Sequence, residues 1–132
     1  MGTLKKILYV EDQKDIQIIA EYALAAISGY TVKTSNSGIE ALAEIEAFEP
    51  DLLLLDVMMP GLDGPGTLQE IRKLDAYKNT PAIFMTAKIL PNELADLMSQ
   101  GAIAVIPKPF DPVTLGSEIQ VIWDNVQVSL GN

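Results

Sequence analysis

Residues 51–56 read Asp-Leu-Leu-Leu-Leu-Asp, four consecutive leucines between two aspartates. A run this short and this apolar is typical of a strand buried on both faces, as in a parallel sheet covered by helices. Ile7–Val10 (Ile-Leu-Tyr-Val) is a second run of this kind, and it ends in acid as well, at Glu11-Asp12. These two segments predict the centre of a sheet in an α/β fold.

Outward from these two segments, the chain alternates between strands and helices. Three more strands are predicted at 31–34, 82–85 and 104–106. Between the strands, apolar residues recur at helical spacing, and capping residues, glycines and prolines bound the helices. The helices are predicted over 13–28, from Ser37 to before Pro50, from about Thr67 onward, from Pro91 to before Gly101, and from Asp111-Pro112 onward.

Two details of these helices can be tested by the structure. The glycines and prolines at 60–66 are typical of a loop, so the third helix is expected to begin late, around Thr67. Ile39 in the second helix and Val113 in the last are expected to face inward, because both fit the apolar spacing of their helix.

The strict alternation predicts an α/β fold with a doubly wound parallel sheet and helices on both faces. The chain has 132 residues, of which 48% are hydrophobic and 20% charged, enough apolar material for one core but not for two. We see no internal repeat or linker. Residues 3–128 are therefore expected to form one domain, followed by a short C-terminal tail at 129–132.

Composition excludes several classes of function. The formal net charge of −9 repels phosphate backbones and anionic lipids, which disfavours direct nucleic-acid or membrane-surface binding. The chain has no Cys and no His, so it lacks thiolate and imidazole metal ligands and cannot form a Ser-His-Asp triad. No apolar run is long enough for a signal peptide or a membrane span, and the expected location is the cytoplasm.

Polar side chains of complementary kinds follow the first, third, fourth and fifth predicted strands. Glu11 and Asp12 follow the first strand, Asp56 the third, Thr86 the end of the fourth and Lys108 the fifth. Parallel strands place their carboxyl ends at one edge of the sheet, where ligands bind in open α/β folds, so these side chains should converge. Taken singly, each has an ordinary alternative: a helix cap for Asp12, a turn for Asp56, a strand end for Thr86, a solvated surface for Lys108.

Three carboxylates around one ammonium favour the binding of a divalent cation. Ligation by oxygen alone suits Mg²⁺, with Mn²⁺ as the alternative. A carboxylate beside such a cation, an ammonium and a hydroxyl is the set of groups that phosphoryl transfer requires. Asp56 is the best nucleophile candidate, Thr86 could donate a hydrogen bond to the new phosphoryl group, and Lys108 could offset its charge.

Four segments, in this order and spacing, are similar to the motifs of one family. They are Ile7–Asp12, Leu55–Gly61, Met85–Lys88 and Lys108–Phe110. On these segments the chain resembles, over nearly its whole length, a response-regulator receiver domain of bacterial two-component signalling (CheY-like). The resemblance implies a flavodoxin-like, five-stranded, doubly wound parallel sheet with strand order 2-1-3-4-5.

The resemblance also implies a function and a metal site. Asp56 would accept a phosphoryl group from a phosphohistidine on a sensor histidine kinase or a histidine phosphotransfer protein. Mg²⁺, or Mn²⁺ in its place, would be held by Glu11, Asp12, Asp56 and the backbone carbonyl of Met58. The domain would be regulatory, catalysing only its own phosphorylation and dephosphorylation.

Further roles follow from the same resemblance. Thr86 would be the switch hydroxyl, and Lys108 would bind the phosphoryl group from a Lys108-Pro109 peptide that is cis in the family. Met58 and Lys88 would flank the phosphoryl group and tune how readily water attacks it, although Lys88 could equally be a solvated surface residue.

The fifth strand departs from the family pattern. Val105 stands where receivers usually carry Tyr or Phe, so a readout through an aromatic rotamer is not expected. Ile103 and Ala104 replace the acidic residues common there. Two interpretations stay open: core packing, or a docking patch for a second copy or a downstream protein on the face of the fourth helix, fifth strand and fifth helix.

Two other functions remain as alternatives. One is a constitutive adaptor that keeps the receiver fold without being phosphorylated; the complete set of site residues argues against it. The other is an aspartyl-phosphate phosphatase of the haloacid dehalogenase type. Such enzymes place a second Asp two residues after the nucleophile, and here that position is Met58.

Overall fold

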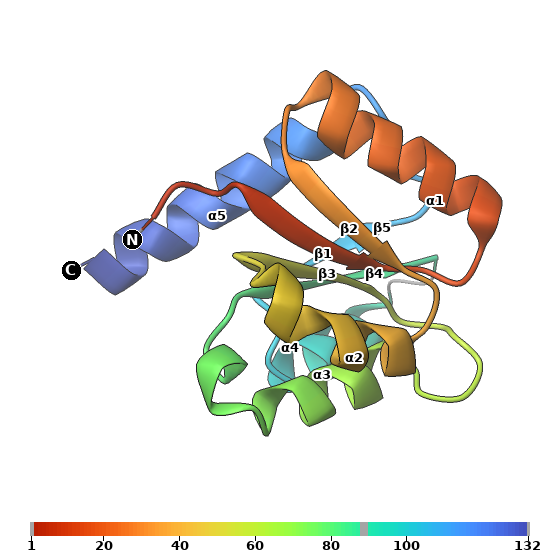
Figure 1. Ribbon diagram of the computed structural model, residues 1–132. Helices are drawn as coiled ribbons and strands as arrows, with labels where there is room; N and C mark the ends of the chain where they lie inside the picture. Colours follow the sequence, from red (N-terminus) through yellow and green to blue (C-terminus); the bar gives the residue numbers. More distant parts are fainter. Residues whose placement is uncertain (1, 88–89, 132) are drawn as a thin grey trace.

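The structure, a computed structural model, describes residues 2–87 and 90–131 (Figure 1). Its centre is a sheet of five parallel strands in the order β2-β1-β3-β4-β5. The strands are β1 (Lys6–Val10), β2 (Thr31–Ser35), β3 (Leu52–Asp56), β4 (Ala82–Thr86) and β5 (Ala104–Pro107). The predicted strands and the strand order 2-1-3-4-5 are confirmed.

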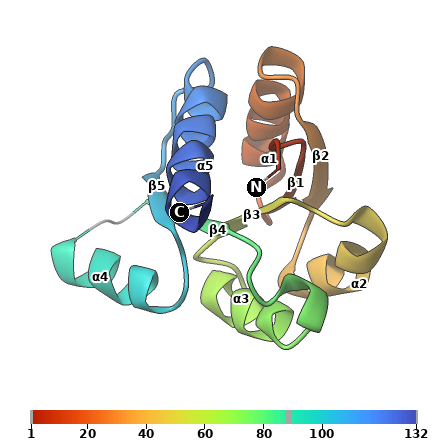
Figure 2. The same ribbon diagram turned by 90° about the vertical axis from the view of Figure 1, so that its left-hand side faces the viewer.

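Helices cover both faces of the sheet, as Figures 1 and 2 show. One face is covered by α1 (Lys14–Glu21), its π-helical continuation (Tyr22–Ile27) and α5 (Leu115–Gly131). The other face is covered by α2 (Gly38–Phe48), α3 (Gly64–Arg72) and α4 (Pro91–Ser99), with a 3₁₀ turn at Asp75–Tyr77. The fold is therefore the doubly wound α/β fold expected from the sequence.

Each central strand contributes to two separate cores. Tyr9, Leu52 and Leu54 point into the cluster under α1 and α5, whereas Leu53 and Leu55 point into the cluster under α2, α3 and α4. All five residues of β3 are buried, which explains why this strand carries leucine at four successive positions instead of alternating with polar residues. The two cores fix the sheet from both sides and thereby the positions of the strand ends.

The predicted start of the third helix is wrong. The helix α3 begins at Gly64, three residues before Thr67, because the side chain of Asp63 caps it by accepting a hydrogen bond from the Gly66 amide at 2.8 Å. Pro65 fits the first turn, where a missing amide proton costs nothing. Gly64 lies directly against the backbone of Asp56, where a side chain would collide with the Asp56 carbonyl oxygen.

The ends of two other helices also differ from prediction. The last helix begins at Leu115; the Asp111 carboxylate accepts from the amide of Val113 in the preceding turn, which leaves the Val113 side chain 71% exposed. Ile39, in the first turn of α2, is 66% exposed rather than inward-facing. The predicted helix 13–28 is continuous, but its second half is π-helical.

Among the described residues, no helix is both long and apolar enough to cross a membrane.

Candidate functional site

The carboxyl ends of β1 and β3 bring three acidic side chains together. Glu11, Asp12 and Asp56 each place a carboxylate oxygen within 4.8 Å of the others. Glu11 and Asp56 are buried, whereas Asp12 is half-buried at the mouth of the cluster. The convergence expected from the strand order is found.

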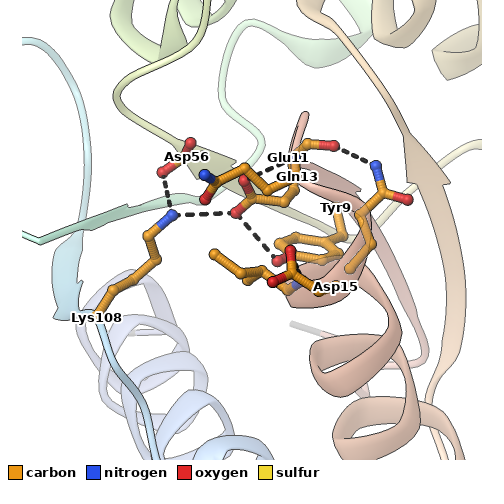
Figure 3. Close-up of polar contacts among 8 residues, drawn as sticks. Tyr9, Glu11, Gln13, Asp15, Asp56 and Lys108 are labelled. Atoms are coloured by element: carbon orange, nitrogen blue, oxygen red, sulfur yellow. Dashed lines mark hydrogen bonds and ion pairs between the residues drawn. The ribbon is translucent and has the colours of Figure 1, made fainter.

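Lys108 lies between two of these carboxylates (Figure 3). Its Nζ donates to Asp56 Oδ1 at 2.9 Å and to Glu11 Oε1 at 3.2 Å, and its side chain is 13% exposed. The Lys108 amide donates to the Thr86 carbonyl at 2.9 Å, which joins the end of β5 to that of β4. The Lys108-Pro109 peptide is cis, as the resemblance implied.

Glu11 is held by its neighbours as well as by Lys108. The hydroxyl of Tyr9 donates to Glu11 Oε1 at 3.3 Å, and the amide of Gln13 donates to Oε2 at 3.2 Å. The side-chain amide of Gln17, in α1, donates to the main-chain carbonyl of Glu11. Both the side chain and the backbone of Glu11 are therefore fixed before any ligand arrives.

Asp12 does not cap the first helix. The N-cap position of α1 is Gln13, and no side chain makes a capping hydrogen bond there. Asp12 therefore has no capping role, and its carboxylate belongs to the acidic cluster.

The electrostatics of the cluster favour a cation. Burial raises the pKa of Glu11 above its ordinary value, the nearby Asp56 raises it further, and Lys108 opposes both. Burial likewise raises the pKa of Asp56 against the hydrogen bond and charge of Lys108. Burial alone would lower the pKa of Lys108, but its hydrogen bonds and ion pairs with Asp56 and Glu11 raise it. One ammonium thus does not fully compensate the carboxylates, and added positive charge would stabilise their ionised forms.

The structure describes all but one of the other predicted residues. Thr86 ends β4 and is buried. Met58 lies in the loop after β3, two residues beyond Asp56, with its side chain 77% exposed. Lys88 lies outside the described residues. Val105 is half-buried and packs against the core under α2, α3 and α4.

Tyr9 and Gln17 contact the site although the sequence analysis did not single them out. Tyr9 lies in β1, and Glu11 follows the end of this strand two residues later, so the extended spacing places the two side chains on the same side and could have identified Tyr9. Gln17 sits on the inward face of α1 between apolar residues, a polar position that the helical spacing could have marked.

Comparisons with known proteins agree with this geometry. The family model of the response regulator receiver domain matches residues 7–120. Among curated relatives, "Probable transcriptional regulator ycf27" of Cyanophora paradoxa is 41% identical over 119 residues, covering 88% of this chain and 47% of that protein. The alkaline phosphatase synthesis transcriptional regulatory protein PhoP of Bacillus subtilis is 36% identical over 125 residues, covering 95% and 51%. The chain spans about half the length of these relatives.

Solved structures give the same result. The chemotaxis protein CheY4 of Vibrio cholerae superposes with a TM-score of 0.84 at 31% identity, covering 91% of this chain and 99% of that one. A CheY-like receiver domain protein from Methanospirillum hungatei superposes with a TM-score of 0.79 at 28% identity, covering 96% and 99%. With the family match over most of its length, the flavodoxin-like sheet and the acidic cluster at its carboxyl edge, the chain belongs to the receiver domains of two-component response regulators.

Proposed function

We propose that this receiver domain is a phosphoacceptor switch in which Asp56 takes a phosphoryl group from a phosphohistidine of a sensor histidine kinase or a histidine phosphotransfer protein. The observation that carries the proposal is the position of Asp56, hydrogen-bonded to Lys108 and within 4.8 Å of two more carboxylates. Residues 3–128 form the signalling unit, and α5 continues beyond it to Gly131, into the segment 129–132 that was expected to be a tail. The chain acts on itself and turns over no other substrate.

The donor set fits Mg²⁺, with Mn²⁺ as a substitute. All the donors are oxygen atoms, and the carboxylate oxygens lie close enough together to bind one ion. Because Glu11 and Asp56 are buried, their negative charges are unfavourable without a cation. Glu11, Asp12, Asp56 and the backbone carbonyl of Met58 would hold the ion. When bound, Mg²⁺ supplies positive charge that offsets the negative charge of the phosphoryl oxygens.

The transfer itself needs few groups from the protein. A carboxylate oxygen of Asp56 attacks phosphorus, the phosphorus–nitrogen bond of the donor breaks, and the imidazole leaves with its electron pair. Lys108 turns its ammonium to the transferred phosphoryl oxygens, whose charge exceeds that of the original carboxylate. These 132 residues contain no His, so the donor imidazole must come from outside them.

The phosphoryl group then changes the surface of the domain. Thr86 is buried at the end of the neighbouring strand, and its hydroxyl can donate to a phosphoryl oxygen. Movement of Thr86 toward this oxygen would displace the segment that follows β4 and alter the packing of Val105 on the adjacent β5. The chemical event at Asp56 would thereby reach the face made by α4, β5 and α5.

The surface beside Lys108 suits the phosphodonor. Ile16, Ile19, Pro109 and Phe110 line a small apolar pocket there together with Lys108. Ile18, on the same helix, is 69% exposed. A donor protein must cover this region to bring its imidazole to Asp56, and exposed aliphatic side chains give it an apolar surface to bind.

The output partner is a second copy or a downstream protein bound at α4, β5 and α5. Ile103 and Ala104 are half-buried against the core under α1 and α5, so core packing accounts for part of the apolar character of β5. On α4, Met98 is exposed. Light scattering that stays monomeric with and without beryllofluoride, together with unaltered partner binding by Val105→Glu, would remove this part of the proposal.

Phosphorylation by a small-molecule donor tests the main proposal. Acetyl phosphate with Mg²⁺ should add one phosphoryl group to the wild type, and none to Asp56→Asn or to the wild type in a chelator, as measured by intact mass. An unmodified wild type would favour a constitutive adaptor. Release of many phosphates per chain from phosphate esters would favour a phosphatase of the haloacid dehalogenase type.

A further inference from the structure

Tyr9 is a polar residue inside an apolar core. Its side chain is fully buried in the cluster under α1 and α5, next to aliphatic residues of the neighbouring strands. A buried hydroxyl without a hydrogen bond costs free energy that a phenylalanine at the same place would not. The hydroxyl is satisfied by Glu11 Oε1, 3.3 Å away, which is also an acceptor for Lys108.

Tyr9 and Lys108 differ in how firmly they hold Glu11. The ring of Tyr9 is packed on all sides, whereas Lys108 is a long side chain that also bonds to Asp56. In the proposed function, Lys108 turns toward the phosphoryl group and gives up part of its contact with Glu11. The Tyr9 hydroxyl can stay in place throughout, because its hydrogen bond is to Glu11 and not to Asp56 or Lys108.

We propose that Tyr9 is a positioning residue that keeps the Glu11 carboxylate oriented for the divalent cation, independently of Lys108. The Gln13 amide donates a hydrogen bond to the other oxygen of the same carboxylate. Tyr9 and Gln13 together therefore hold both carboxylate oxygens of Glu11 (Figure 3). This inference rests on the proposed function, because it assigns a role to Tyr9 at that same metal site.

The test is the affinity of unphosphorylated protein for Mn²⁺, measured by electron paramagnetic resonance on the full chain. Tyr9→Phe removes one oxygen atom and leaves the buried ring in place. Loss of a group that orients a metal ligand weakens metal affinity by about tenfold or more, and we expect a loss of this size. Stability is measured in parallel by urea unfolding without metal.

Tyr77→Phe is the matched control. Tyr77 is also buried, and its hydroxyl also donates a hydrogen bond, to the Ile45 carbonyl at 3.2 Å, but it lies in the other core and bonds to none of Glu11, Asp12, Asp56 and Lys108. Both variants lose a buried hydrogen bond. Only Tyr9→Phe is expected to lose Mn²⁺ affinity.

A Lys108→Met background separates Tyr9 from the lysine. If Tyr9 acts independently, Tyr9→Phe weakens Mn²⁺ binding in this background by at least the factor seen with Lys108 present. Equal affinity of wild type and Tyr9→Phe, an equal loss in Tyr77→Phe, or disappearance of the effect without Lys108 overturns the role of Tyr9. If the wild type binds no Mn²⁺, the proposed metal site itself is wrong. This outcome is distinguishable from a failure of the Tyr9 role, in which the wild type still binds Mn²⁺.

Discussion

Lys108 Nζ lies 2.9 Å from Asp56 Oδ1 and joins the end of the edge strand β5 to the end of the central strand β3, two strands away. The pair exists because the parallel strands all point their carboxyl ends to one edge, and because two apolar cores hold those ends in register. Asp56 therefore meets a cation before any ligand is present.

Asp56→Asn should stabilise the protein at neutral pH. Burial raises the pKa of Asp56 in the folded state, so the folded state binds the proton more tightly than the unfolded state does. Wild type then loses stability as pH rises through the unfolded-state pKa of about 4, and the variant lacks the Asp56 contribution to this loss while keeping that of Glu11. The gain should be present at pH 7 and vanish in acid, as measured by urea unfolding across pH. A variant less stable than wild type at pH 7 would contradict this.

Lys108→Met should have the opposite effect. The variant leaves Glu11 and Asp56 buried and facing each other without the ammonium that joins them, which we expect to cost about 2–4 kcal/mol of unfolding free energy at pH 7. The control is Lys73→Met, which removes an exposed ion pair with Glu70 and should cost less than about 1 kcal/mol. Equal losses of unfolding free energy in the two variants would mean that the ion pairs of Lys108 contribute no more than an exposed surface pair.

Mg²⁺ should stabilise the folded protein if the acidic cluster binds it. At a concentration one hundred times its dissociation constant, the metal adds about 2.7 kcal/mol to the unfolding free energy. Asp12→Asn should lose most of this gain, whereas Asp15→Asn, an exposed change in the first turn of α1, should keep it. Thermal unfolding with and without Mg²⁺ measures both, and an equal gain in both variants would place the ion elsewhere.

Gly64→Ala should displace Asp56 through its backbone. The new methyl group would overlap the carbonyl oxygen of Asp56, so either α3 or the end of β3 must shift. We expect a loss of about 2–4 kcal/mol in unfolding free energy, together with slower phosphorylation of Asp56. Gly2→Ala, where nothing lies within 4 Å of the added carbon, is the control. A fully stable Gly64→Ala with normal phosphorylation would show that this contact is adjustable.

The sequence predicted the sheet well because the strands are buried on both faces. Leu52–Leu55 and Ile7–Val10 leave no polar residue that could place them at a surface, and the polar residues that follow mark where each strand ends. The convergence of Glu11, Asp12, Asp56 and Lys108 then followed from the direction of the strands alone. Strand order 2-1-3-4-5 came from the resemblance to the family, not from these patterns.

The details that the sequence missed depend on tertiary contacts. Gly64 and Pro65 are typical loop residues, yet the cap from Asp63 and the close packing on Asp56 place both of them in α3. Tyr9 has apolar neighbours in the first strand, and its two-residue spacing from Glu11 was the only sign of a polar role; the hydrogen bond between the two side chains is seen only in the structure. The π-helical turns at Tyr22–Ile27 likewise have no signal in the apolar spacing.

The most direct test is to trap the acyl phosphate chemically. After treatment with acetyl phosphate and Mg²⁺, borohydride reduces an aspartyl phosphate to homoserine, which peptide sequencing by mass spectrometry locates. The proposal predicts homoserine at position 56 in the wild type, and none in Asp56→Asn or without Mg²⁺. Homoserine at any other aspartate, or at position 56 to the same extent without metal, would contradict the account of Asp56 as the phosphoacceptor of a metal-dependent switch.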